Sequence, residues 1–158
     1  MYSELTHGTT IQIYLPRHSG EEATHLEAAQ TDMPQGRGET LLLVEDETSV
    51  LDVGKEILER LGYTVWIASG PAEAMEIIRQ HSKELHLLVT DVVMPEMNGK
   101  ELARQISERR PHIRTLFMSG YTADAVAHHG ILEKNVNFIQ KPFTVSGLAF
   151  KIREVLDQ

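Results

Sequence analysis

From Thr40 to the end of the chain, short apolar runs alternate with helical patterns. Runs of strand length lie at 41–44, 65–68, 85–90, 115–118 and 137–140, and the first is apolar throughout, as expected of a strand buried on both faces. Apolar residues recur at helical spacing in the segments 50–61, 71–78, 102–106, more weakly 124–129, and 145–156. Thr144 is placed to cap the last helix, with Phe143 and Leu148 as a hydrophobic staple. The pattern predicts five strands, each followed by a helix.

This alternation predicts an α/β fold, a doubly wound five-stranded parallel sheet with right-handed crossovers and helices on both faces. If the runs are numbered along the chain, the expected strand order is 2-1-3-4-5. In such a sheet the ligand lies at the carboxyl ends of the strands, beside the point where the strand order reverses. The residues that directly follow the first and third strands are therefore the first candidates for a site.

The first 39 residues follow a different pattern. Ile11, Ile13 and Leu15 alternate with polar residues, which predicts a half-buried strand that ends at Pro16 and has no evident partner nearby. Residues 18–39 have few large apolar side chains and collect Gly, Pro, Gln, Thr and Glu, which predicts a flexible acidic linker. The chain is therefore divided into a strand segment at 1–17, a linker at 18–39 and one α/β domain at 40–158.

Composition and charge narrow the function. The 158 residues, 41% of them hydrophobic, suit one globular domain, and the formal charge of −8 argues against nucleic acid and against direct membrane contact. The absence of cysteine excludes disulfides and thiolate metal sites. Because the sequence contains neither an apolar run of membrane-spanning length nor a signal-peptide pattern, we expect a cytoplasmic protein.

Carboxylates follow both strands at the expected reversal point. Glu45 and Asp46 come after the first strand and Asp91 after the third, so the three should converge and repel one another unless a cation is bound. An all-oxygen cluster suits Mg²⁺, with Mn²⁺ as the alternative. Ser119 after the fourth strand adds a hydroxyl donor, and Lys141 after the fifth adds a compact positive charge. Together these groups predict a phosphoryl site in which one carboxylate is the nucleophile.

Four segments also stand in the order found in one known family. They are Leu-Leu-Leu-Val-Glu-Asp-Glu at 41–47, Thr-Asp-Val-Val-Met-Pro-Glu-Met-Asn-Gly at 90–99, Phe-Met-Ser-Gly-Tyr at 117–121 and Gln-Lys-Pro-Phe at 140–143. The Asp-x-x-Met-Pro-x-Met-x-Gly segment is highly specific. Residues 40–158 thus resemble a two-component response-regulator receiver domain, which implies the flavodoxin-like receiver fold.

The resemblance assigns a role to each candidate residue. It makes Asp91 the phosphoacceptor, Glu45 and Asp46 the acidic metal pair, and the backbone carbonyl of Val93 a further Mg²⁺ ligand. The first acidic position is Glu45 rather than the commoner aspartate, which should lengthen the reach to the metal without removing the ligand.

The same resemblance implies a conformational switch. Ser119 is the switch hydroxyl that turns toward the phosphoryl group, Lys141 is the ion-pair partner of that group, and Phe138 is the aromatic switch that turns inward. The bond between Lys141 and Pro142 is expected to be cis. Phosphorylation should then alter the surface formed by the fourth helix, fifth strand and fifth helix, which is also a candidate surface for a homodimer.

Two positions that tune loss of the phosphoryl group in this family are filled by Val93 and Tyr121. An apolar side chain and a bulky ring neither orient an attacking water well nor leave it much room. We therefore expect slow self-dephosphorylation, and no catalytic activity of this chain beyond self-phosphorylation and this slow loss.

The N-terminal segment, residues 1–17, resembles part of a second family, the sensor histidine kinases. Gly8-Thr9-Thr10 followed by residues 11–17 is similar to the final glycine turn and strand of the ATP-binding domain of a sensor histidine kinase. With the linker and receiver behind it, this is the layout at the C-terminus of a hybrid histidine kinase. The other nucleotide-binding boxes are absent, so we expect no kinase activity from this chain itself.

The favoured function is a phosphoryl-accepting switch whose partner is a histidine kinase or a histidine phosphotransfer domain. The enzyme alternative is an aspartyl-phosphate phosphatase of the haloacid-dehalogenase type, which needs a second aspartate where Val93 stands. His128 and His129 lack a third metal ligand at suitable spacing. A group of arginines is expected to form an exposed face near the third helix: Arg104, Arg109, Arg110 and Arg114.

Overall fold

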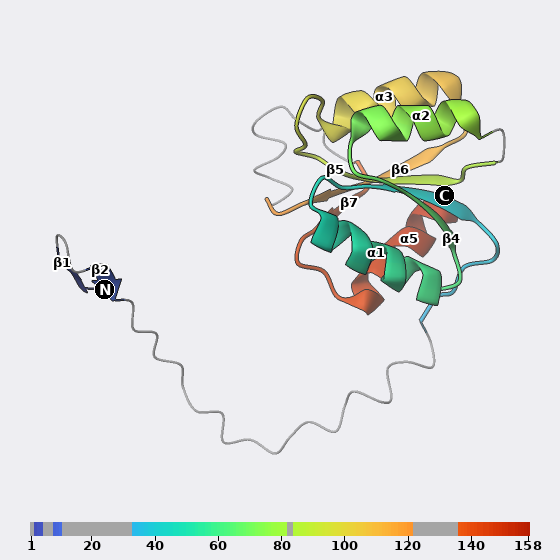
Figure 1. Ribbon diagram of the computed structural model, residues 1–158. Coiled ribbons are helices and arrows are strands. Elements are labelled where there is room, and N and C mark those ends of the chain that lie inside the picture. Colours follow the sequence, from blue (N-terminus) through green and yellow to red (C-terminus); the bar gives the residue numbers. More distant parts are fainter. Residues whose placement is uncertain (1, 5–7, 11–32, 82–83, 122–135) are drawn as a thin grey trace, which may run out of the picture. The chain divides into compact units, whose positions relative to one another are not determined.

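The computed structural model describes residues 2–4, 8–10, 33–81, 84–121 and 136–158 (Figure 1). The chain divides into two compact units, residues 1–31 and 32–158. In the first unit, strands β1 (Tyr2–Glu4) and β2 (Gly8–Thr10) pair antiparallel. The sequence pattern did not predict this pair, and the alternating segment 11–15 lies outside the described residues.

The second unit is built on a five-stranded parallel sheet. Its strands are β3 (Thr40–Val44), β4 (Thr64–Ala68), β5 (Leu87–Asp91), β6 (Arg114–Ser119) and β7 (Phe138–Gln140). They lie in the order β4-β3-β5-β6-β7, which confirms the predicted order 2-1-3-4-5. Because Val44 pairs with Thr90, the residues that follow β3 emerge next to the end of β5.

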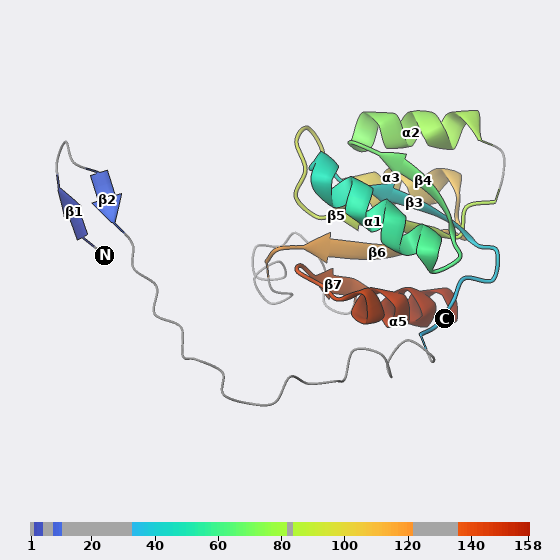
Figure 2. The same ribbon diagram turned by 60° about the horizontal axis from the view of Figure 1, so that its bottom comes forward.

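Helices cover both faces of the sheet. The described helices are α1 (Thr48–Arg60), α2 (Pro71–Gln80), α3 (Gly99–Arg109) and α5 (Val145–Leu156). Helices α2 and α3 lie on one face, and α1 and α5 lie on the other (Figures 1 and 2). No helix in the described parts of the chain is long and apolar enough to cross a membrane. The helix predicted at 124–129 and the His128–His129 pair fall outside the described residues.

The apolar run of β3 explains why it can be buried on both sides. Leu41 and Leu43 point into the cluster that contains residues of α1 and α5, whereas Leu42 and Val44 pack in the cluster that contains residues of α2 and α3. All four side chains are at most 2% exposed. Burial of an aliphatic side chain of this size contributes about 1.5–3 kcal/mol, so this strand anchors both layers.

Local sequence signals set the helix ends. Gly62, with a φ of 85°, follows the end of α1, and Pro71 opens α2. The hydroxyl of Thr144 accepts a hydrogen bond of 3.0 Å from the Gly147 N–H, which confirms the predicted cap of α5. Phe143 packs against the same core cluster as Leu148, as expected of a hydrophobic staple.

Residues 33–39, which we call the N-terminal strap, contact the α/β domain. The N–H of Gly36 donates to the carbonyl of Leu61 over 2.6 Å. The carboxylate of Glu39 accepts a hydrogen bond of 2.7 Å from Arg153 of α5, and these side chains are only 13% and 11% exposed. The strap belongs to the residues predicted as linker, but it packs as part of the domain. The predicted division of the chain into three segments stays a prediction.

Candidate functional site

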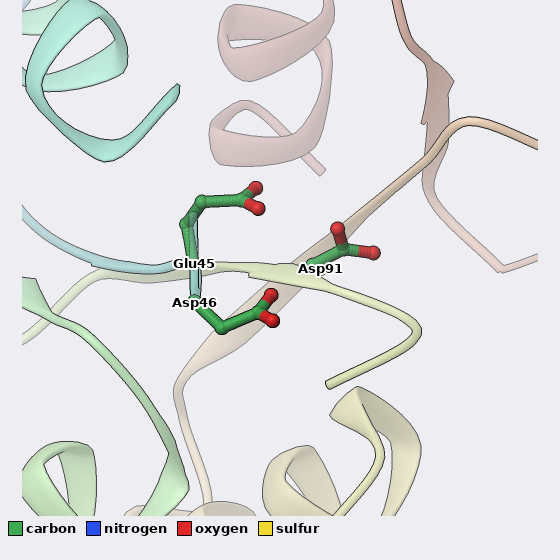
Figure 3. Close-up of side chains that lie close together, drawn as sticks. All are labelled: Glu45, Asp46 and Asp91. Atoms are coloured by element: carbon green, nitrogen blue, oxygen red, sulfur yellow. The ribbon is translucent and has the colours of Figure 1, made fainter. Parts of the chain in front are cut away.

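Three carboxylates meet at the carboxyl edge of the sheet. Glu45 and Asp46 directly follow β3, Asp91 ends β5, and their side chains lie close together (Figure 3). One carboxylate oxygen from each residue lies within 4.8 Å of those of the other two. Glu45 is buried, Asp91 is half-buried and Asp46 is exposed. The cluster therefore combines a protected interior with a side that is open to solvent.

The donor set fits a hard divalent cation. All three side chains offer oxygen ligands. Among the described residues, these three are the His, Asp and Glu side chains that lie close enough together to hold a metal ion. A few carboxylates that leave positions for water and for a phosphate oxygen describe a Mg²⁺ site better than a dedicated Ca²⁺ cage.

Lys141 joins this cluster from the end of β7. Its Nζ donates to Asp91 Oδ2 over 2.6 Å and also to the carboxylate of Glu45. The backbone N–H of Lys141 donates to the carbonyl of Ser119 over 2.8 Å, which ties the loop after β7 to the end of β6. The bond between Lys141 and Pro142 is cis, as the resemblance implied. The lysine is thus held at the predicted phosphoacceptor.

Burial and charge oppose one another in this site. Burial raises the pKa of Glu45, and the ammonium of Lys141 only partly offsets that effect. Burial alone would lower the pKa of Lys141, but the hydrogen bonds and charges of Asp91 and Glu45 raise it overall. The ammonium therefore stays protonated, and the deeply buried carboxylate of Glu45 gains from any further positive charge.

The backbone after Asp91 is held by the first turn of α3. The N–H of Val93 donates to Asp91 Oδ1 over 3.1 Å, and the N–H of Gly99 donates to the Val92 carbonyl over 3.0 Å. A Cβ on Gly99 would lie only 2.1 Å from the Asp91 carbonyl oxygen. The glycine of the Asp-x-x-Met-Pro-x-Met-x-Gly segment is thus required by close approach, a reason that the sequence alone did not supply.

The predicted switch residues lie on the two neighbouring strands. Ser119 ends β6 and is 1% exposed, and its Oγ accepts a hydrogen bond of 3.2 Å from the Tyr121 N–H. Phe138 begins β7 and packs, half-buried, against the core cluster on the α2 and α3 side. Val93 and Tyr121 are 51% and 64% exposed, so both side chains stand in solvent at the rim of the site.

An apolar groove, which we call the α1 groove, lies beside the site. It has a volume of about 530 Å³ and is lined by Ser49, Val50, Val53, Gly54, Ile57, Lys141, Pro142 and Phe143. Val53 is 58% exposed, although its helical spacing grouped it with core residues of α1. Sequence reasoning missed the groove, because helical spacing does not tell a solvent-facing valine from a buried one.

Comparison with known proteins agrees with this geometry. The model of the response regulator receiver domain family matches residues 41–153. The chain is 36% identical over 163 residues to sensor kinase CckA of Brucella abortus, in an alignment that covers 99% of this chain and 17% of CckA. It is 34% identical over 116 residues to the response regulator receiver protein CpdR of Brucella abortus, covering 73% of this chain and 95% of CpdR.

Solved structures give the same result. The receiver domain of the hybrid histidine kinase CckA matches with a TM-score of 0.62 and 30% identity, over 74% of this chain and 98% of that one. A CheY-like receiver domain from Methanospirillum hungatei matches with a TM-score of 0.64 and 31% identity, over 76% and 94%. The family model matches most of the chain, and the strand order and the acidic cluster at the sheet edge agree with it. This chain therefore belongs to the response regulator receiver domain family.

Proposed function

We propose that the carboxylate of Asp91 accepts a phosphoryl group from a phosphohistidine. The donor is a histidine kinase or a histidine phosphotransfer domain, in keeping with membership of a two-component family. One observation carries the proposal: Asp91 Oδ2 lies 2.6 Å from the ammonium of Lys141, in a cluster with two further carboxylates. A solvated surface aspartate needs neither this partner nor these neighbours.

Each of the chain's own groups has a separate role in the phosphoryl transfer. A carboxylate oxygen of Asp91 attacks phosphorus, and the bond from phosphorus to the imidazole nitrogen breaks with its electron pair left on that nitrogen. Lys141 exchanges its hydrogen bond with Asp91 for one to a phosphoryl oxygen, and the hydroxyl of Ser119 donates to another. The Val93 N–H orients the carboxylate of Asp91 before the attack.

A divalent cation completes the charge balance. The carboxylates of Glu45, Asp46 and Asp91 and the backbone carbonyl of Val93 would hold Mg²⁺, with Mn²⁺ as the alternative. When bound, the ion neutralises negative charge on the phosphoryl oxygens. The burial that raises the pKa of Glu45 favours such a cation, because it leaves a carboxylate short of solvation.

The output surface lies next to the site. Rotation of Ser119 and Phe138 toward the phosphoryl group would change the exposed face of β7 and α5, together with the segment between β6 and β7, where the fourth helix is predicted. The same face is the proposed contact for a homodimer. The side chain of Val93 has no group that can hydrogen-bond an attacking water, and the ring of Tyr121 is bulky, which supports slow loss of the phosphoryl group.

We assign the α1 groove to the phosphohistidine donor. Lys141 lines this groove and also donates to Asp91, so a protein seated there would cover the phosphoacceptor. The apolar surface of Val50, Val53 and Ile57 suits an apolar helix face of such a partner.

The domain is proposed to act as the receiver of a hybrid histidine kinase. The alignment with CckA extends over 99% of this chain and therefore includes the N-terminal segment, which resembles the end of a kinase ATP-binding domain. The phosphatase alternative is disfavoured, because the position of its second acid holds the exposed side chain of Val93.

The proposal is tested by incubating the purified chain with Mg²⁺ and acetyl phosphate and measuring the intact mass. We expect one added phosphoryl group, its loss in Asp91→Asn, and its loss when EDTA replaces Mg²⁺. Asp52→Asn, which alters an exposed aspartate on α1, is the matched control and should be phosphorylated normally. An undiminished adduct in Asp91→Asn would overturn the assignment.

A further inference from the structure

A second cavity, which we call the basic cavity, lies at the amino ends of the strands, at the end of the sheet opposite to the acidic cluster. It has a volume of about 570 Å³ and lies at the amino ends of β5 and β6, beside the end of α3. Its polar lining comes from Glu84, His86, Arg109, Arg110, His112 and Arg114. None of these residues belongs to the phosphorylation site or the α1 groove.

The charge of this cavity is opposite to that of the chain. Three guanidinium groups and two imidazoles face a single carboxylate, in a protein whose formal charge is −8. Arg109 and Arg114 have no ion-pair partner among the residues that the structure describes, whereas Arg104, on the same helix as Arg109, pairs with Glu101 and Glu108. The sequence pattern placed these arginines together on an exposed face, but Arg110 and Arg114 are partly buried.

Backbone contacts hold the lining in place. The guanidinium of Arg110 donates to the carbonyl of His81 over 2.6 Å, and the N–H of Arg114 donates to the carbonyl of His86 over 3.2 Å. These bonds fix the side chain of Arg110 and the backbone that carries Arg114, so this part of the lining needs little ordering on binding.

His86 presents a defined donor. Its Nδ1 accepts a hydrogen bond of 3.0 Å from the Thr40 N–H. Since Nδ1 accepts, the hydrogen of the neutral ring must sit on Nε2, and that N–H is a donor with no partner among the described residues. A cavity lined by two unpaired guanidiniums and this N–H offers several donors and a single carboxylate.

We propose that the basic cavity binds a small anion that carries a polyphosphate group. Guanidinium groups bind phosphate oxygens through paired hydrogen bonds, which suits Arg109 and Arg114. The volume lies within the range of about 300–1,000 Å³ found for small-molecule sites. The remaining lining, Leu85, Pro111 and Ile113, offers apolar contact to an organic part of the ligand. This site goes beyond the proposed phosphoryl transfer and shares no residue with it.

Binding is measured on the full ¹⁵N-labelled chain by NMR titration with pyrophosphate and, separately, with ADP. EDTA is present and ionic strength is held constant, so that the acidic cluster cannot recruit phosphate through a metal. We expect saturable shifts of the amides of residues 84–86, 109–110 and 112–114, while those next to Asp91 stay unchanged. Tighter binding of ADP would identify a nucleotide as the ligand, and equal binding would identify the inorganic polyphosphate group as sufficient.

Matched variants distinguish binding by the arginines of the cavity from nonspecific attraction to positive charge. Combined Arg109→Gln and Arg114→Gln should weaken the affinity at least about tenfold, whereas Arg104→Gln should leave it unchanged. Equal losses in both variants, no saturation, or shifts centred on Asp91 would overturn the proposal. Saturation by a poly-glutamate peptide but by neither phosphate probe would overturn it in favour of a protein partner.

Failure of this site remains distinguishable from failure of the phosphoryl-acceptor proposal. The double variant should still be phosphorylated at Asp91 by acetyl phosphate, and Asp91→Asn should still bind the anion. Circular dichroism checks that each variant is folded. Anion binding that disappears in Asp91→Asn would contradict the assignment to the basic cavity.

Discussion

The α carbon of Gly99 faces the backbone carbonyl of Asp91 so closely that a Cβ at this position would lie 2.1 Å from the oxygen. The contact joins the first residue of α3 to the proposed phosphoacceptor. Because the obstructing atom is backbone, a larger side chain must move the loop itself.

Gly99→Ala should therefore lower both stability and phosphorylation. We expect a loss of about 1–3 kcal/mol in the free energy of unfolding, as for other overpacked sites, and a fall of at least about tenfold in the acetyl phosphate reaction, because displaced reacting groups lose rate steeply. Urea denaturation and intact-mass kinetics measure the two effects. Gly70→Ala is the control, since a Cβ there meets no atom within 4 Å; because Gly70 caps α2, we expect a loss of less than about 1 kcal/mol and an unchanged phosphorylation rate.

Removal of Lys141 should strengthen metal binding while it slows phosphorylation. Lys141→Gln leaves the carboxylates of Glu45 and Asp91 without their shared ammonium, so the added charge of Mg²⁺ becomes more favourable. We expect Mg²⁺ to raise the melting temperature more in this variant than in the native protein, and the acetyl phosphate reaction to slow at least about tenfold. Lys151→Gln, at an exposed ion pair of α5, should behave as the native chain. Weaker Mg²⁺ binding by Lys141→Gln would contradict this account.

Phosphorylated Asp91 should hydrolyse slowly in the native chain and faster in Val93→Asn. An amide at this exposed position can orient an attacking water, for which we expect an acceleration of about tenfold. The half-life is followed by intact mass after removal of acetyl phosphate. Val145→Asn changes an exposed valine on α5 that makes no contact with Asp91 and should leave the half-life unchanged. A half-life of only seconds in the native chain would contradict the role given to Val93 and Tyr121.

A charge introduced into the α1 groove should slow phosphorylation by a protein donor but not by a small-molecule donor. Val53→Asp alters a side chain that is 58% exposed, so its effect on stability should be small. We expect transfer from a phosphorylated partner kinase to fall at least about tenfold, because a carboxylate would be buried against an apolar partner. Phosphorylation by acetyl phosphate should be unchanged. Equal effects on the two donors would show that the groove does not dock the donor.

The ion pair between Glu39 and Arg153 should make part of the stability depend on pH. Burial raises the pKa of Glu39, but hydrogen bonds from the Arg37 N–H and from Arg153 outweigh this and lower it below the ordinary value of 4.5. A lowered pKa in the folded state adds stability at pH values above 4.5, and this stability is lost as the pH falls through the folded value.

Glu39→Gln should accordingly cost about 1–3 kcal/mol at pH 7, and the gap from the native protein should shrink as the pH drops below 4.5. Urea denaturation at several pH values measures the gap. Glu56→Gln removes a solvent-exposed ion pair and should change stability by less than about 1 kcal/mol. A gap that is constant across this range would contradict the assignment.

The sequence predicted the sheet well, because its signals are local. Each described strand of the α/β domain corresponds to an apolar run, and Gly62, Pro71 and Thr144 mark helix ends, the first two by their backbone conformation and Thr144 by its hydroxyl. The acids at the strand ends could be placed together because parallel strands share one carboxyl edge.

Features that depend on distant partners could not be predicted this way. Glu39 and Arg153 are 114 residues apart, and no periodicity connects them. The lining of the basic cavity likewise joins the start of β5 to the end of α3. The pairing of Tyr2–Glu4 with Gly8–Thr10 was missed because segments of three residues carry too little pattern to identify a strand.

The N-terminal strap has a practical consequence for constructing fusion proteins. A receiver excised at Thr40 would lose Glu39 and leave the guanidinium of Arg153, only 11% exposed, with the half-exposed carboxylate of Asp157 as its remaining partner. A chimera that keeps residues 33–39 retains the ion pair between Glu39 and Arg153, together with the hydrogen bond from Gly36 to Leu61. When this receiver is fused to another protein, the junction therefore belongs before residue 33, because a fusion that starts at β3 would lack these stabilising contacts.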